Sequence, residues 1–213
     1  MVAPQSVWPG VPARIGPNRA LEPRATPLVR FLQQQPREGA APLRLLPPGP
    51  GFMDNQWMAF GLASAGGYHP AKLARFEHLV DTRRQTLDPH LLDLFAVRWV
   101  VLPQRLQSGL TPAYEGTDGV VYENTRALPR AWVTGRWERV EAGDSCKARL
   151  LADDFEFSQV VLLESDPQPP PDVAATGTAR VTAFSANRVG LEVTATAPAL
   201  VVLAEAYHSG WRA

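Results

Sequence analysis

The sequence predicts an α+β fold, with helices and short strands first and a mainly antiparallel β-sheet or incomplete β-sandwich after them. In the first half, apolar residues recur at helical spacing, most clearly in the stretch 73–80. In the second half, apolar and polar residues alternate, and within 188–196 the pattern places Val189, Leu191 and Val193 on one face. We expect three parts: a proline-rich extended arm at 1–27, an α+β part at 28–104 and a mainly antiparallel β part at 105–213, whose last strands lie within 178–207.

Residues 1 to about 27 contain six prolines, which are excluded from helix interiors and central strands, so the arm is expected to be extended or irregular. Two interpretations of the arm stay open: a disordered leader, or a segment that lies along a partner protein. Val7, Trp8 and Val11 are the residues that would bind this partner, because large apolar side chains are poorly suited to pure solvation.

The first half of the chain predicts three helices and two strands. Pro70 and Pro89 can each take the first position of a helix, and Asp88 is expected to be an N-cap. Pro36 ends the first helix, since the residue before a proline disfavours helical backbone angles. In order, we expect a helix from 28 that ends before Pro36, a strand at 43–47, a helix at 70–84, a helix that follows Asp88 and a strand at 97–103.

The second half predicts six strands and one helix. The helix is expected at 145–154, and the proline-rich spacer 167–172 separates the last three strands from the rest. Tandem short strands of this kind are typical of an antiparallel sheet or sandwich. The expected strands span 120–124, 130–140, 159–164, 179–184, 188–196 and 199–207.

Composition excludes several classes of protein. The 213 residues carry 21 basic and 21 acidic side chains, a balance that argues against a general nucleic-acid-binding protein. Cys146 is the only cysteine, so neither an intrachain disulfide nor a cysteine-based zinc site can form. The sequence shows no apolar stretch of the about 20 residues that span a membrane, and no signal peptide at its start. Taken alone, these features predict a soluble cytoplasmic protein.

The sequence predicts neither catalysis nor a bound metal or cofactor. The histidines at 69, 78, 90 and 208 match no spacing of metal ligands or catalytic groups. Asp153 and Asp154 are adjacent carboxylates, but neighbours in a helix or strand point apart. No nucleophile, base and oxyanion site assemble from the sequence, so we expect a protein that is not an enzyme.

Two features of composition leave alternatives open. Most of the six tryptophans are expected to be core or interface anchors, and the other interpretation is a sugar-stacking surface formed by Trp57, Trp132 and Trp137. The chain has 19 arginines but only two lysines, Lys72 and Lys147. A genome-composition bias explains this excess, or else a surface rich in interfaces does, because arginine pairs well with carboxylates and aromatic rings.

Several motifs, notably GGYHP, YEN-x-RALPRA and the terminal GWRA, resemble the YfhO-type bacterial membrane proteins over about residues 28–213. Those proteins look like glycosyltransferases of the GT-C kind that use lipid-linked sugars, and their C-terminal part is a soluble domain outside the cytoplasmic membrane. This chain lacks the membrane-spanning helices and the acidic loop residues that would carry catalysis. It also has His208 and Ser209 where the family pattern has an aromatic residue and a proline. The resemblance therefore implies a fold and a side of the membrane, with no catalytic residue to carry over.

Two functions are weighed on these grounds. The first is a non-catalytic, extracytoplasmic (periplasmic) accessory subunit, peripheral to the membrane, that docks on an integral membrane-protein complex of transport, respiration or photosynthesis. The second is a carbohydrate-binding or substrate-guiding module beside a lipid-linked-sugar glycosyltransferase. In the family the sheet continues beyond GWRA, so we expect an unpaired sheet edge that a partner covers, or that makes a lone fragment aggregate.

Overall fold

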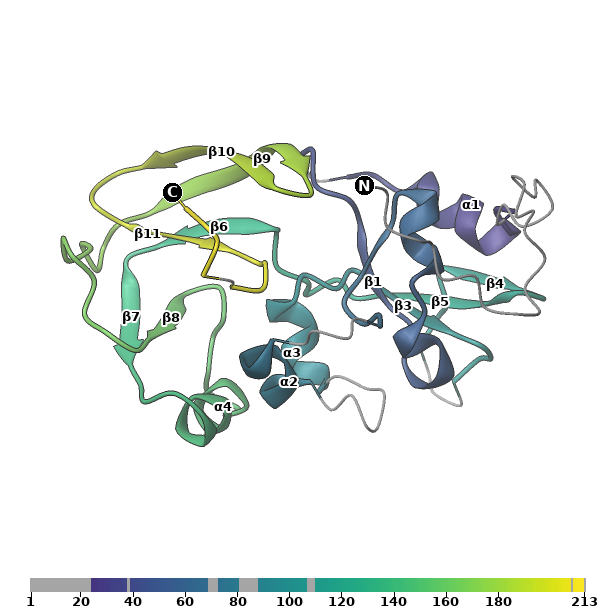
Figure 1. The fold of residues 1–213 in the computed structure, drawn as a ribbon, viewed down its shortest axis with the longest axis horizontal. Helices are drawn as coiled ribbons and strands as arrows, with labels where there is room; N and C mark the ends of the chain where they lie inside the picture. The colour runs from purple at the N-terminus through teal and green to yellow at the C-terminus, as the bar shows by residue number, and fades with distance from the viewer. Residues whose placement is uncertain are drawn as a thin grey trace, which may run out of the picture.

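The predicted α+β fold class is confirmed by a computed structural model, which describes residues 24–37, 39–68, 73–80, 88–106, 110–207 and 209–212. These residues form four α-helices, two short 3-10 helices and eleven strands (Figure 1). The strands make one mixed sheet of five strands and three two-stranded pairs. None of the helices in the described ranges has the length and apolar character needed to cross a membrane.

The five-stranded sheet has the order β2-β1-β3-β5-β4. Strand β1 runs parallel to β2 and β3, whereas β5 is antiparallel to both β3 and β4. The change of architecture that we expected near residue 104 therefore falls inside one sheet, between β3 and β4. The strand bounds are β1 Arg44–Leu46, β2 Ala63–Ser64, β3 Trp99–Leu102, β4 Tyr114–Gly116 and β5 Gly119–Glu123.

Helix α1 (Pro27–Gln33) lies where a helix was expected before Pro36, and it packs on this sheet. The Thr26 hydroxyl accepts a hydrogen bond from the Val29 N–H and caps the helix, which is the usual role of threonine at this position. The Asp118 carboxylate accepts a second bond, of 2.7 Å, from the Leu28 N–H. Buried side chains of the helix, of β1, β3 and β5, and of the segment that carries Trp57 then form one apolar cluster, which includes Leu28, Leu32, Leu45, Trp57, Trp99 and Val121.

A second apolar cluster lies between the sheet and the helices α2 (Ala74–Leu79), α3 (Pro89–Leu94) and α4 (Asp144–Leu150). The predicted N-cap of α3 is confirmed, because the Asp88 carboxylate accepts a bond from the His90 N–H. Helix α2 begins only at Ala74, after an extended Leu73, and not at Pro70 as expected. Residue 70 itself lies outside the described ranges. Two 3-10 helices that the sequence did not indicate, η2 (Gly49–Met53) and η3 (Gln56–Phe60), add Phe52 and Trp57 to the two cores.

The second half forms a small, incomplete β-sandwich. The hairpin of β9 (Gly177–Ser185) and β10 (Arg188–Ala195) lies over the antiparallel pair of β6 (Ala131–Thr134) and β11 (Leu200–Leu203) (Figure 1). The single strand expected at 130–140 is instead two strands, since the chain bends at Gly135, where the backbone of Asp172 approaches too closely for any side chain. The second of them, β7 (Arg136–Arg139), pairs with β8 (Val160–Leu163) in parallel.

Candidate functional site

A buried cluster of charged residues lies where the five-stranded sheet meets the sandwich. Arg44 comes from β1, Arg130 directly precedes β6, and Glu205 follows β11. The Arg44 guanidinium donates a 2.9 Å bond to Glu205 Oε1 and two further bonds to the carbonyl oxygens of Phe95 and Ala204, at 2.8 and 2.7 Å. Arg130 Nη2 donates to the same Glu205 oxygen. One carboxylate therefore balances two guanidinium groups.

Arg130 is the least satisfied member of this cluster. It is only 6% exposed, and its Nε and Nη1 atoms have no hydrogen-bond acceptor in the described part of the chain. Its guanidinium carbon lies 5.5 Å from the centre of the Phe184 ring on β9, a cation–π contact. Burial lowers the pKa of Arg44 to about 10, and burial together with the charge of Arg44 lowers the pKa of Arg130 to about 9. Both groups remain cationic at neutral pH.

A polar clamp holds the loop that delivers Arg130. The buried Asp93, on α3, accepts a 2.8 Å bond from the Asn124 side chain through one oxygen and pairs with Arg126 at 3.0 Å through the other. The Asp93 carbonyl also accepts a bond from the Leu128 N–H. A buried carboxylate of this kind needs such partners to offset its lost hydration. The clamp fixes the path of the residues between β5 and β6, and thereby the position of Arg130.

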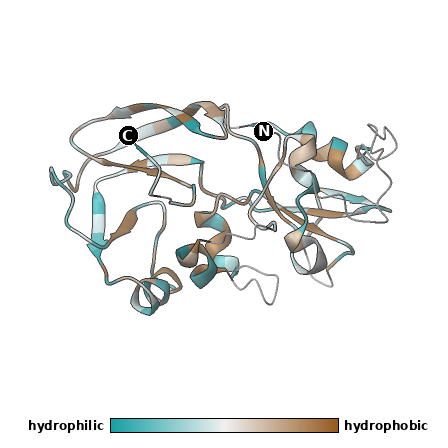
Figure 2. Cartoon of the chain, viewed as in Figure 1, coloured by the Kyte–Doolittle hydropathy of each residue, from teal (hydrophilic) through white to brown (hydrophobic). Residues whose placement is uncertain are grey.

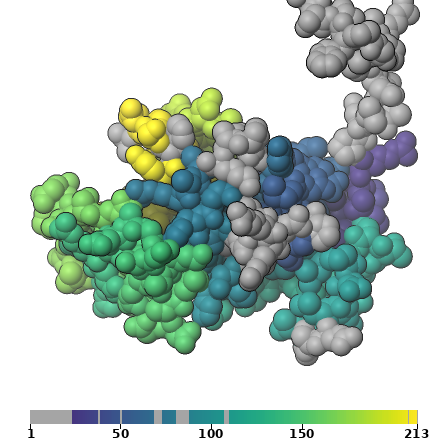
Figure 3. Space-filling view, turned by 60° about the horizontal axis from the view of Figure 1, so that its bottom comes forward, coloured from purple at the N-terminus to yellow at the C-terminus, as the bar shows by residue number. Residues whose placement is uncertain are grey.

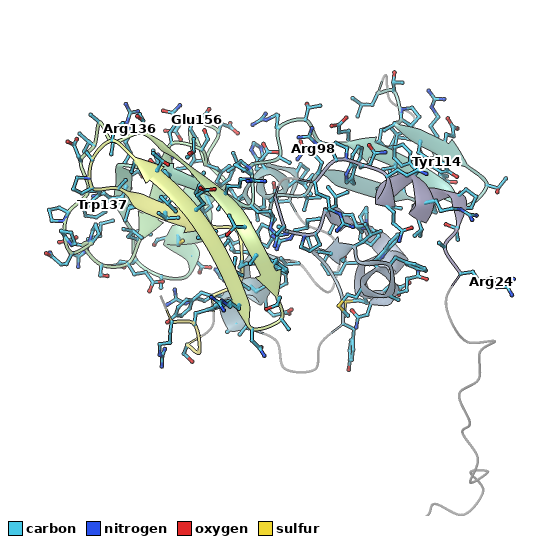
Figure 4. All side chains as sticks on the ribbon, turned by 90° about the horizontal axis from the view of Figure 1, so that it is seen from above. Arg24, Arg98, Tyr114, Arg136, Trp137 and Glu156 are labelled. Carbon is cyan, nitrogen blue, oxygen red and sulfur yellow. The ribbon has the colours of Figure 1, made fainter. Side chains whose placement is uncertain are left out.

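Arginines gather around one cavity of about 330 Å³, which we call the arginine cavity. Arg44 and Arg130 line its buried part, whereas Arg37 is exposed and Arg98 is partly exposed. Figure 4 shows Arg98 in the central part of the molecule. Glu123 lines the cavity too and pairs with Arg98 at 2.7 Å. The lining thus runs from solvent-exposed cations at the rim to desolvated ones inside.

A second cavity, of about 400 Å³, shares Arg44 with the arginine cavity and is mainly apolar. Trp132 of β6, Phe76 of α2 and Leu203 of β11 contribute to its wall, together with the polar Arg75 and Glu205. In Figure 3, the surface of the segment around α2 lies between the surface of residues 140–165 and that of the C-terminal residues. The ion pair of Arg75 with Glu164, at 2.6 Å, holds this wall to the end of β8.

The sandwich leaves a seam of apolar side chains open to solvent, which we call the open seam: Leu191, Val193 and Val201. Leu191 pairs with Val181, which packs on Ala131 of β6, so the inner face of the hairpin turns toward the β6–β11 pair. Alternate residues of a strand share a face, so Val193 and Val201 also face this space. All three nevertheless stay 37 to 43% exposed, and Figure 2 shows β11 hydrophobic along its length.

The predicted sugar-stacking residues do not form one surface. Trp57 packs in the core under α1, Trp132 lines the apolar cavity, and both are 8% exposed. Trp137 is half-buried on β7 and lies beside Arg136 at the far end of the molecule (Figure 4). Two of the three indoles are therefore buried at separate places in the fold, and only Trp137 is partly open to solvent. The predicted partner-binding residues Val7, Trp8 and Val11 lie outside the described residues.

The remaining histidines, acidic residues and cysteine that the sequence analysis considered do not form a reactive site among the described residues. The His78 ring lies 3.2 Å from the exposed Asp144 carboxylate, His90 is exposed, and Asp154 pairs with Arg149 at 2.8 Å. Cys146 is half-buried, and burial raises the pKa of its thiol, which makes it a poor nucleophile. Within the described ranges, no three histidine, cysteine, aspartate or glutamate side chains gather as metal ligands would. His69 and His208 lie outside those ranges.

The chain matches no protein-family model, no curated protein and no solved structure at a significant level. The likeness to YfhO-type proteins therefore stays a prediction from motifs. One of those motifs, YEN-x-RALPRA, contains Asn124, Arg126 and Arg130, the residues of the clamp and of the charged cluster. Sequence reasoning missed their role, and the only signal of it was the excess of arginine over lysine.

Proposed function

We propose that the chain is a non-catalytic, extracytoplasmic accessory domain that docks on a membrane-protein complex. The observation that carries docking is the open seam of the sandwich. Single exposed apolar side chains are ordinary on protein surfaces. Leu191, Val193 and Val201, in contrast, sit between two β layers that bury Val181 and Ala131. A third element inserted at the seam would complete this core.

The same region supplies further apolar surface for a partner. Tyr207 is 70% exposed, and Trp211 and Phe184 are also exposed. Interfaces of stable complexes are enriched in aromatic residues of this kind. In the described part of the chain, β11 pairs with β6 alone, so its other edge offers backbone groups for strand addition. The location outside the cytoplasm is supported by the family resemblance only.

The docking proposal is tested by the native size of the chain in its own membranes. Extraction in mild detergent should recover the chain at a fixed ratio within a large complex that contains an integral membrane protein. Val193→Asp places a charge in the seam and should release the chain from that complex. Thr194→Asp is the matched control, because Thr194 is the exposed neighbour on the opposite face of β10. Recovery of the unaltered chain as a free 23.3 kDa protein would contradict docking.

A carbohydrate-binding or substrate-guiding role is the second candidate, and the apolar cavity is the observation that favours it. Trp132 lines this cavity, and its indole N–H has no acceptor among the described residues. An aromatic wall with a few polar groups such as Arg75 and Glu205 is typical of small-ligand sites. Titration with neutral monosaccharides should then give saturable heat that Trp132→Phe abolishes. Absence of heat in the unaltered chain would eliminate this candidate.

A further inference from the structure

We infer that the arginine cavity is a binding site for a phosphate monoester. This inference is independent of the docking proposal, since the open seam contributes no residue to the cavity. Three properties of the cavity support it: unpartnered donors on a buried cation, an excess of positive charge, and a size suited to one small group.

The unpartnered donors are the strongest observation. Arg130 is buried, and its Nε and Nη1 atoms have no acceptor in the described structure. Trp99 also lines the cavity, and its buried indole N–H likewise has no acceptor there. Buried polar groups in proteins are nearly always hydrogen-bonded, and charged ones are the costliest to leave unpaired. An acceptor-rich group in the cavity would satisfy these donors.

The charge of the cavity selects an anion with about two negative charges. Arg37, Arg44, Arg98 and Arg130 line it, and the two carboxylates that pair with them are Glu123 and Glu205. Four cations and two anions leave two positive charges without a partner among these residues. A phosphate monoester carries about −1.5 to −2 charges at neutral pH and offers three acceptor oxygens to guanidinium forks. A single carboxylate would leave one of these charges unbalanced.

Access and size fit the same ligand. Arg37 is exposed and Arg98 partly so, which gives an anion a cationic path from the rim to the buried Arg44 and Arg130. A cavity of about 330 Å³ is at the small end of ligand sites and holds a phosphate with a compact organic group. Its remaining wall comes from small or apolar side chains such as Ala127 and Leu128.

The test is calorimetric titration of the full chain with inorganic phosphate and with glucose 6-phosphate. We expect saturable binding, weakened about tenfold or more in Arg130→Gln, because a hydrogen bond to a charged group is lost. Arg37→Gln should weaken it as well, and Arg37 has an exposed side chain whose replacement leaves the core intact. Arg136→Gln is the matched control, because Arg136 is exposed on β7, far from Arg98 in Figure 4. Its affinity should stay within about twofold of the unaltered chain.

Vesicles distinguish the two sources of a phosphate monoester. If phosphatidic acid vesicles recruit the chain in addition to the binding of soluble phosphates, and phosphatidylcholine vesicles do not, the ligand is a lipid headgroup; if only the soluble phosphates bind, it is a free metabolite. Both outcomes support the site, provided that Arg37→Gln weakens the binding and Arg136→Gln does not. Equal binding by Arg37→Gln and Arg136→Gln overturns the inference. So does the absence of saturation by both soluble phosphates at about 10 mM, which is ten times a millimolar Kd.

Discussion

Replacing Glu205 by glutamine should destabilise the fold more than any surface change, because this carboxylate balances two buried guanidinium groups. Arg44 keeps two carbonyl acceptors in Glu205→Gln. Arg130 keeps only a neutral amide oxygen and its contact with Phe184, so most of the cost falls on Arg130. Removing one charged partner of a buried ion pair lowers the free energy of unfolding by about 3–5 kcal/mol. Because Glu205 is partly accessible to water, we expect a loss of unfolding free energy at the lower end of this range, about 3 kcal/mol.

Urea unfolding followed by circular dichroism measures this loss directly. For a chain of this size, about 3 kcal/mol corresponds to a fall in Tm of roughly 6–12 °C. Glu192→Gln is the matched control, since Glu192 is exposed on β10 and should change stability by less than about 0.5 kcal/mol. A loss below about 1 kcal/mol in Glu205→Gln would refute the reasoning, because the two arginines would then not depend on this carboxylate.

Three further changes test other parts of the fold. Asn124→Ala removes the bond to Asp93 and should cost about 1–3 kcal/mol in urea unfolding; an unchanged midpoint would show that the clamp contributes nothing. Desolvation raises the pKa of the Asp118 carboxyl, but the bonds donated by the Leu28 N–H and the Thr26 and Tyr114 hydroxyls outweigh it and lower that pKa. Its contribution to stability is therefore complete above about pH 4 and is lost as the pH falls further, so Asp118→Asn should flatten the acid side of the stability profile. Leu45→Ala, in the core of the sheet, should cost about 2–5 kcal/mol by calorimetry, and a cost under 1 kcal/mol would mean that this core is loosely packed.

Local sequence signals predicted those elements whose causes are local. The cap of α3 is one case, because Asp88 and Pro89 act on the first turn of their own helix. The β9–β10 hairpin is another, since the alternation places Val189, Leu191 and Val193 on the one face that turns toward the β6–β11 pair. These elements were predicted in the right order and close to their observed bounds.

Features set by distant contacts could not be predicted in this way. The break between β6 and β7 depends on the backbone of Asp172, which meets Gly135 only in the folded chain. The parallel pairing of β7 with β8 likewise has no signature in either strand. The charged cluster is the clearest example, because Glu205 lies 161 residues from Arg44 and 75 from Arg130 along the chain. The tryptophans gave no indication of this cluster. Burial, and not residue type, decides whether an indole can contact a ligand, and Trp57 and Trp132 are buried.

Site-specific photo-cross-linking from the open seam tests the docking proposal most directly. A photoreactive amino acid is placed at Val201, within the seam, or at Thr194, on the outer face of β10, and the cells are irradiated before extraction. We expect the probe at 201 to join the chain to one integral membrane protein in a fixed adduct, and the probe at 194 to give none. No adduct from 201, or the same adducts from both positions, would contradict a docking surface at the seam.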